Sequence, residues 1–195
     1  MYKIVHKKGL SDDDRVMFTE FRKNYKNYPY LYSMEKDYED EYQDCYQSLG
    51  DRLDMFVVYD QEGKPIAVSM STPFDKKMSI LSDFYKPDLD LDLDNAYYFA
   101  DIVINKKYHG QGIARELYTQ ATNYAKNLGI SKIYALLVNR DNDPRRPDDF
   151  HYSQLWKEFE FSNTGLSITC EWPTFQLDGS VKMDSNKLDI YMKKI

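Results

Sequence analysis

Apolar positions along the chain follow two periods, and these periods predict the order of its elements. Runs of strand length that are rich in aromatic and β-branched residues indicate buried strands. Apolar residues that recur every three or four positions indicate helices. We therefore expect strands near residues 1–6, 53–59, 66–71, 97–104, 132–138, 167–172 and 188–193, and helices near 12–24, 34–49, 113–128 and 152–159. The order β-α-α-β-β-β-α-β-α-β-β predicts a mixed α/β sheet (α+β) with helices on both faces.

Three of the four predicted helices carry an apolar face. Ser11 is a suitable N-cap for the first helix, because three aspartates follow it in the first turn, where carboxylates suit the helix dipole. The expected buried faces are Val16, Phe18, Phe21 and Tyr25 in the first helix, Tyr38, Tyr42, Cys45 and Leu49 in the second, and Ile113, Leu117, Ala121, Tyr124 and Leu128 in the third.

Two segments are predicted to be loops. Aspartate and leucine alternate at residues 88–94, and four carboxylates on one side favour a solvated loop within 72–95. The leucines stand where an EF-hand needs its glycine and spaced ligands, so this run is not a calcium loop. A second hypothesis is that it attracts a cationic substrate. We also expect a long turn at residues 173–186 between the two closing strands.

The segment from residue 97 to 129 predicts a strand, a glycine-bearing turn and a helix. Gly110 and Gly112 allow a ligand to approach the backbone where a Cβ would clash. The N–H groups that open the helix would bind an anion such as a phosphate. A Rossmann fingerprint is excluded because Arg115 stands where its third glycine is needed, and no P-loop motif occurs in the chain. A simple tight turn and a different phosphate-binding protein remain alternatives.

The segment His109–Ala114 resembles motif A of the GNAT superfamily of N-acetyltransferases, R/Q-x-x-G-x-G/A, whose amides hold the pyrophosphate of acetyl-CoA. Gly112 and Ala114 match the two small positions, and His109 replaces the usual Arg or Gln. The segments PYLY at 29–32 and RPDDF at 146–150 are similar to those of a bacterial subgroup. The resemblance covers most of the chain. It implies a single domain over residues 1–195 with the acyl-CoA N-acyltransferase fold and splayed parallel strands.

The resemblance also implies which residues contact acetyl-CoA. A backbone N–H near Ile104 would polarise the acetyl carbonyl, and Asn139 would bond the pantetheine arm. Arg115 would meet a phosphate or simply cover the helix, and Trp156 occupies the position of the usual tyrosine acid. The full set is Ile102, Val103, Ile104, His109, Gly110, Gln111, Gly112, Ile113, Ala114, Arg115, Asn139 and Trp156.

Two residues are implied as catalytic groups and three as contacts to the acceptor. Asp101 is the expected base, directly or through water, and its alternative is an ordinary exposed or salt-bridged aspartate. Trp156 cannot deliver a proton at neutral pH, so Tyr152, one helical turn earlier, is the expected acid or otherwise a packing residue. The segment before the second strand lines the acceptor site in the family, which implies Tyr30, Tyr32 and Glu35, unless these residues only pack the helices.

The composition of the chain limits the kinds of partner and cellular compartment that we expect for the protein. A length of 195 residues suits one domain, and a net charge of −6 argues against nucleic acid but permits a cationic amine. Two cysteines without zinc-ligand spacing suggest a reducing cytoplasm and no metal. The polar start and the lack of a long apolar run predict neither a signal peptide nor a membrane span. Exposed aromatic residues in the closing strands would suit a homodimer.

The expected function is an N-acetyltransferase that transfers the acetyl group of acetyl-CoA to a primary amine of a small molecule or a protein. The alternative is a GNAT-fold module that binds CoA for regulation and has lost turnover, as the residues at positions 109 and 156 would permit.

Overall fold

The computed structural model describes residues 2–23, 33, 35–75, 91–139, 156–176 and 178–195. Seven strands in these ranges form one sheet in the order β1-β2-β3-β4-β5-β7-β6. The strands are β1 (Lys3–Lys8), β2 (Asp54–Tyr59), β3 (Pro65–Pro73), β4 (Ala96–Ile104), β5 (Lys132–Val138), β6 (Ser162–Phe175) and β7 (Val181–Lys194). The longer helices are α1 (Asp12–Arg22), α2 (Lys36–Ser48) and α4 (Ile113–Asn127), and the short 3-10 helices are η2 (Gly50–Arg52) and η3 (Lys106–Tyr108).

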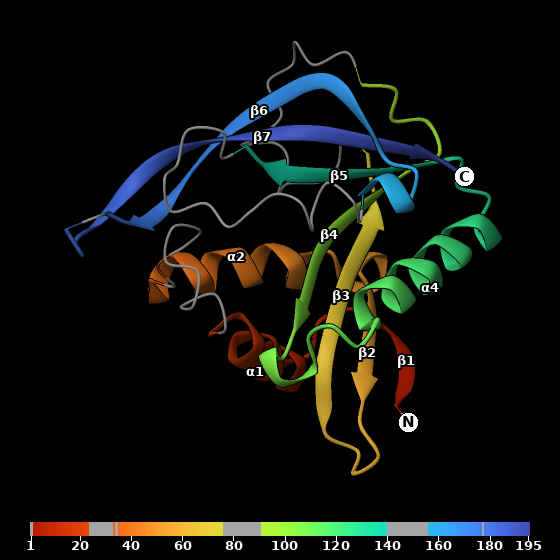
Figure 1. Cartoon of the computed structure of the whole chain (residues 1–195), viewed down its shortest axis with the longest axis horizontal. Coiled ribbons are helices and arrows are strands. Elements are labelled where there is room, and N and C mark those ends of the chain that lie inside the picture. The colour runs from red at the N-terminus through yellow and green to blue at the C-terminus, as the bar shows by residue number, and fades with distance from the viewer. Residues whose placement is uncertain (1, 24–32, 34, 76–90, 140–155, 177) are drawn as a thin grey trace.

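The sheet consists of two halves that diverge (Figure 1). Strands β1 to β4 form one half and β5, β7 and β6 form the other. The halves meet where β4 and β5 run parallel, which confirms the predicted β-α-β unit, and all other neighbours are antiparallel. The parallel ladder is short, because it joins only residues 96–99 of β4 to residues 132–135 of β5.

Two hydrophobic cores cover the two faces of the sheet. Successive residues of β2 alternate between them, so that Met55 and Val57 lie in one core and Phe56 and Val58 in the other. The first core contains the buried residues of α1 and α2, and the second contains those of α4. The prediction of helices on both faces is therefore confirmed.

A β-bulge in β4 interrupts this alternation. In the ladder with β3, Ser71 pairs with Phe99 but Met70 pairs with Asp101, so Ala100 is an extra residue without a partner in the register. Phe99 lies in the core beneath α4.

Beyond the bulge the two faces are exchanged. Val103 lies in the core beneath α1 and α2, whereas Ile102 and Ile104 pack against the core beneath α4. Asp101 precedes Val103 by two residues and therefore shares its face. Strict alternation from Phe99 would have placed the carboxylate beside α4 instead.

Two predicted apolar positions on the helices were wrong. Val16 is 66% exposed, because it lies on the opposite side of α1 from Phe18. The buried face of α1 instead includes Asp14 and Arg22, whose charges are paired. Leu128 is 51% exposed, because it is the C-cap residue that follows the last turn of α4.

The long turn predicted at residues 173–186 was also wrong. Each closing strand has 14 residues, and the connection is a tight turn. The Gln176 N–H donates to Ser180 O at 2.8 Å, and the Ser180 N–H donates to Asp178 Oδ1 at 2.9 Å. Much of this hairpin is exposed, so its polar residues carry no apolar period that sequence reasoning could detect.

The start of α1 gives the first testable prediction. The Asp14 N–H donates to Ser11 Oγ at 3.2 Å, while Asp14 Oδ1 lies 2.6 Å from Lys7 Nζ. Burial acts to raise the pKa of Asp14, but the hydrogen bonds from Lys7 and Ser11 hold it below its usual value. A carboxyl whose pKa is lower in the folded than in the unfolded state stabilises the protein at pH values above the unfolded-state pKa. This stabilisation is lost as the pH falls through the folded-state pKa.

We expect Asp14→Ala to lower the free energy of unfolding by about 1–2 kcal/mol at pH 7. The loss should shrink below about pH 4, where the unfolded carboxyl is protonated. Urea unfolding at pH 7 and pH 3 measures both values, and Asp13→Ala, which changes an exposed side chain in the same turn, is the control. An equal loss at the two pH values would show that the charge of Asp14 contributes nothing.

Candidate active site

A left-handed glycine turn joins the end of β4 to α4. Gly110 has a φ of 75° and Gly112 a φ of 78°. A Cβ added at either position would meet nothing within 4 Å, so the space beside the turn is open and only the backbone conformation requires glycine. The turn can therefore bring its backbone close to a ligand.

The first turn of α4 has the free N–H groups of an anion site. Gly112 is its N-cap and supplies no side-chain cap. The intrahelical ladder begins where the Glu116 N–H donates to Gly112 O at 3.1 Å, which leaves the amides of residues 113–115 without acceptors in that ladder. These amides and the helix dipole favour a phosphate.

The two basic side chains predicted at this turn have protein partners. His109 Nε2 lies 2.9 Å from Ile104 O. A neutral His109 that donates there presents Nδ1 as an acceptor, so only a protonated ring could also donate to a phosphate. Arg115 forms an exposed ion pair with Glu158, with Nη2 2.8 Å from Oε1. Gln111 donates weakly to Lys107 O at 3.4 Å.

The edge of β4 opens next to this turn. The ladder to β5 ends at Phe99 and Ala135, and the two strands then diverge (Figure 1). Residues 102–104 of β4, predicted to follow the acyl arm, lie beyond this point. Asn139 follows the end of β5 and donates from Nδ2 to Asp189 Oδ2 at 2.8 Å, so its amide is held by β7.

The carboxylate of Asp101 lies in the part of β4 beyond its ladder with β5, and it faces α1 and α2. Its side chain is 12% exposed. The hydroxyl of Tyr42 donates to Asp101 Oδ2, and Arg22 Nη1 lies 3.5 Å from the same oxygen. The hydroxyl of Tyr46 lies 3.0 Å from that of Tyr42. Asp101 is therefore a shielded carboxylate and not an exposed one.

Arg22 connects this carboxylate to the helices. Its Nε lies 2.6 Å from Glu39 Oε1, and both side chains are buried. Its guanidinium also lies over the ring of Tyr42, 4.3 Å from the centroid. Sequence reasoning missed Arg22 as a site residue. The available signal was a charged residue four positions after Phe18, on the buried face of α1.

Burial and the charge of Asp101 determine the state of the two tyrosines. Burial, and then Asp101, raise the pKa of Tyr42 and the pKa of Tyr46 well above their usual values. Both hydroxyls are therefore protonated at neutral pH and can act as hydrogen-bond donors.

The structure describes only some of the residues that were predicted to contact the acceptor substrate or to act as the acid. Tyr30, Tyr32 and Tyr152 lie outside the described residues. Glu35 is exposed at the N-cap of α2, and its Oε1 lies 3.4 Å from Ser33 Oγ. The segment before α2 contacts the closing hairpin, because the Ser33 N–H donates to Pro173 O at 2.9 Å.

Trp156 lies in the aromatic core beside α4 and not on an open surface. Its ring packs against Tyr118, Phe161 and Tyr191, with the Phe161 centroid 4.7 Å away. Among the described residues, no group accepts a hydrogen bond from its Nε1. This burial favours a packing role, and the predicted contact with a cofactor remains untested.

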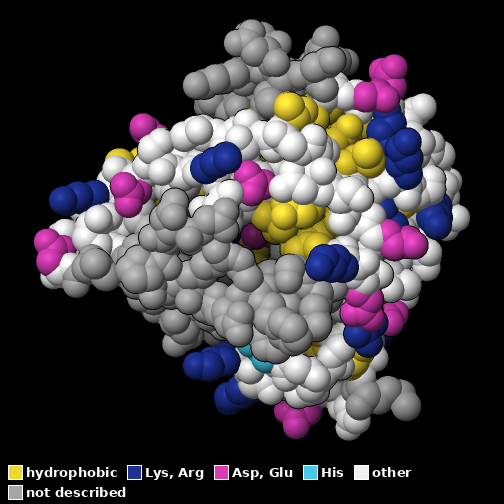
Figure 2. Space-filling view, turned by 45° about the horizontal axis from the view of Figure 1, so that its top comes forward, with side chains coloured by type: hydrophobic (Ala, Val, Ile, Leu, Met, Phe, Trp, Pro, Cys, Tyr) yellow, Lys and Arg dark blue, Asp and Glu magenta, His cyan; other side chains and the backbone are white. Residues whose placement is uncertain are grey.

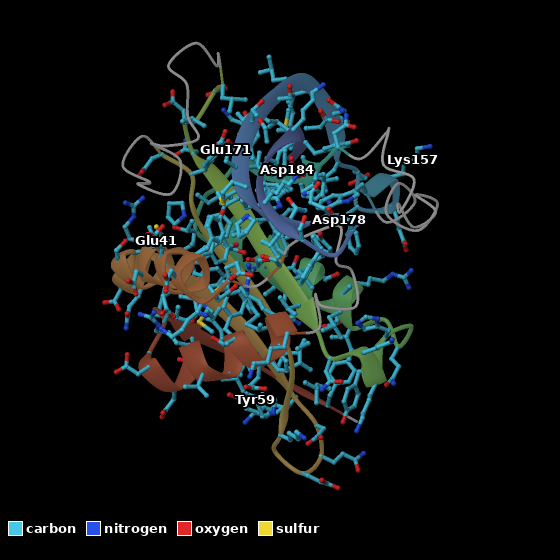
Figure 3. The ribbon with its side chains drawn as sticks, turned by 90° about the vertical axis from the view of Figure 1, so that its left-hand side faces the viewer. Glu41, Tyr59, Lys157, Glu171, Asp178 and Asp184 are labelled. Carbon is cyan, nitrogen blue, oxygen red and sulfur yellow. The ribbon has the colours of Figure 1, made fainter. Side chains whose placement is uncertain are left out.

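Exposed acidic side chains occur on α2 and on the closing hairpin. Figure 2 shows a patch of hydrophobic side chains with both acidic and basic side chains next to it. In Figure 3, Glu171, Asp178 and Asp184 of the hairpin lie above α2, which carries Glu41, while Tyr59 lies at the opposite end of the sheet. The described ranges contain no group of three or more metal-ligating side chains and no helix that is long and apolar enough to span a membrane.

Several solved structures share this fold. One is the ribosomal-protein-S18-alanine N-acetyltransferase from Escherichia coli, with a TM-score of 0.60, 14% identity, and coverage of 100% of this chain and 94% of that one. Another is an N-acetyltransferase from Staphylococcus aureus Mu50, with a TM-score of 0.59, 14% identity and 98% coverage of both chains. At these identities the likeness shows the fold alone. No curated protein matches the sequence.

Residues 17–147 match the family model described as Acetyltransferase (GNAT) family. This match covers more than half of the chain, and it includes α2, the bulged strand β4, the glycine turn and α4. The chain therefore belongs to the GNAT acetyltransferase family.

Proposed function

We propose that the protein is an acetyl-CoA-dependent N-acetyltransferase that acts on a primary amine. One observation carries the proposal: the uncapped start of α4, the open edge of β4 and the carboxylate of Asp101 all occur in one continuous stretch, residues 100–115. An anion site suits the pyrophosphate of the cofactor, an unpaired strand edge suits its acyl arm, and a shielded carboxylate suits removal of a proton from the amine.

The residues present fit acetyl-CoA. The amides at the start of α4 would hold its pyrophosphate, because Gly110 and Gly112 leave the space beside them open. The β4 edge beyond Phe99 offers backbone groups to the acyl arm. The bound molecule would supply an activated acetyl thioester, and the protein would hold it and exclude water.

Asp101 is the proposed base. It lies in the part of β4 that no longer pairs with β5. There its carboxylate could accept a proton from the attacking amine directly or through one water. Its partners Tyr42 and Arg22 approach it from the side of α1 and α2. The predicted roles of Tyr30, Tyr32 and Tyr152 remain proposals for residues outside the described ranges.

The surface favours a cationic acceptor. Glu41 of α2 and Glu171 of β6 are both exposed. The hydroxyl of Tyr38 in α2 lies 3.5 Å from Glu171 O, so the hairpin and the helix are adjacent here. Negative charge around an opening raises the local concentration of ammonium groups. Both a small amine and an amine of a protein satisfy this condition.

Release of the CoA thiol tests the function. We expect thiol release from acetyl-CoA that depends on an added primary amine, measured with a thiol reagent over polyamines, amino acids, aminoglycosides and lysine peptides. Mass spectrometry should show a gain of one acetyl group on the amine. Binding of acetyl-CoA without release over the whole panel would instead support a CoA-binding regulatory module. Absence of both would refute the proposal.

A further inference from the structure

We propose that Tyr42 is a positioning residue that fixes the orientation and the basicity of Asp101. The inference rests on the proposed function, since it concerns the base of that reaction. Tyr42 belongs to α2, and sequence reasoning had assigned it only to the apolar face of that helix. The structure instead aims its hydroxyl at Asp101 Oδ2.

Counting hydrogens fixes the direction of the chain of hydroxyls. An ionised Asp101 only accepts, so Tyr42 must donate its single hydroxyl hydrogen to it. The hydroxyl of Tyr46, 3.0 Å away, must then donate to the oxygen of Tyr42. Both hydrogens point toward the carboxylate, and donation to a charged form stabilises that form.

Packing holds the ring of Tyr42 in place. The guanidinium of Arg22 covers it at 4.3 Å from the centroid, and the ring of Tyr46 meets it edge-on at 4.9 Å between centroids. A ring fixed on two sides gives its hydroxyl one position. Asp101 Oδ2 is thereby held toward α2, and the orientation of the whole carboxylate is set.

Charged and titratable groups from three elements act on Asp101. They are Arg22 of α1, which is itself paired with Glu39 of α2, Tyr42 and Tyr46 of α2, and Tyr98 of β4. Among these groups, Tyr42 and Arg22 are within hydrogen-bonding distance of the carboxylate of Asp101. Arg22 also holds the helices together, so its replacement would test folding and basicity at once. Replacement of Tyr42 tests the basicity of Asp101 more specifically, because phenylalanine keeps the ring and removes only the hydroxyl.

The direct test measures the titration of Asp101 in the free protein. Carbon-13 NMR of carboxyl-labelled aspartate follows the titration, and Asp101→Asn assigns the resonance. A hydrogen bond to a charged group is worth enough that Tyr42→Phe should raise the proton affinity of Asp101 by about tenfold or more. The midpoint should therefore move to higher pH.

Two further variants separate this role from a general effect of packing. Tyr46→Phe should shift the midpoint in the same direction but less, because it acts through Tyr42. Tyr38→Phe is the matched control one helical turn away: its hydroxyl lies near Glu171 O, and the midpoint should stay in place. An unchanged midpoint in Tyr42→Phe, or an equal shift in Tyr38→Phe, would overturn the inference.

Activity provides a second readout. If the protein acetylates amines, the acidic limb of its kcat/KM profile should move to higher pH in Tyr42→Phe, in step with the NMR midpoint. A profile that only drops in height would show a structural role and contradict the proposal. The NMR experiment needs neither acetyl-CoA nor an amine, so failure of the proposed function would leave its result intact.

Discussion

Replacement of Gly112 by aspartate is expected to weaken binding of acetyl-CoA strongly. The new carboxylate would stand at the N-cap of α4, beside the amides that we assign to the pyrophosphate. It would satisfy those amides itself and repel the ligand. A like-charge contact at about 4 Å costs about 4 kcal/mol near a protein surface, so affinity should fall about a thousandfold. Calorimetry with acetyl-CoA and free CoA measures the loss.

Gly129→Asp is the matched control for this change. Gly129 follows the other end of the same helix, has a φ of 76°, and a Cβ there also meets nothing within 4 Å. The variant therefore carries a similar backbone strain and the same added charge, away from the anion site. It should be less stable than the wild type but should bind acetyl-CoA normally. Equal loss of binding in both variants would mean that strain, and not the site, explains the effect.

Replacement of Asp101 by asparagine is expected to lower turnover by about 100-fold to 10,000-fold, the usual contribution of a general base. Asparagine has the same shape, and its oxygen can still accept from Tyr42, so the site should stay folded. Affinity for acetyl-CoA should be nearly unchanged, because the Asp101 carboxylate faces α1 and α2 and not the start of α4. Steady-state rates with the best amine of the panel, together with calorimetry, measure both quantities.

Glu39→Gln removes a neighbouring carboxylate from the same cluster without touching Asp101. Glu39 pairs with Arg22 Nε, so its loss should affect stability more than turnover. We expect its kcat to stay within about tenfold of the wild type, a smaller change than loss of a general base causes. A kcat for Asp101→Asn that is as high as for Glu39→Gln would show that water or another group removes the proton.

Most of the elements and the glycine turn were determined by local sequence. The period of apolar residues in α4 and the β-branched runs of β4 and β5 act within a few residues, so the strand–turn–helix could be predicted. The glycines at 110 and 112 were predicted to let a ligand approach the backbone, and the structure adds that both have a positive φ. The exposed hairpin escaped prediction, because strands without a buried face lack an apolar period.

The surroundings of Asp101 were decided by the tertiary structure. The bulge at Ala100 exists only in the register between β3 and β4, and it turns the carboxylate from α4 toward α1 and α2. Arg22 and Tyr42 reach it from helices that lie 79 and 59 residues away in the chain. No local pattern encodes these contacts, because register and helix packing depend on how distant segments meet. The sequence by itself thus determined the glycine turn and the helix that follows it, and the folded sheet decided which residues surround the proposed base.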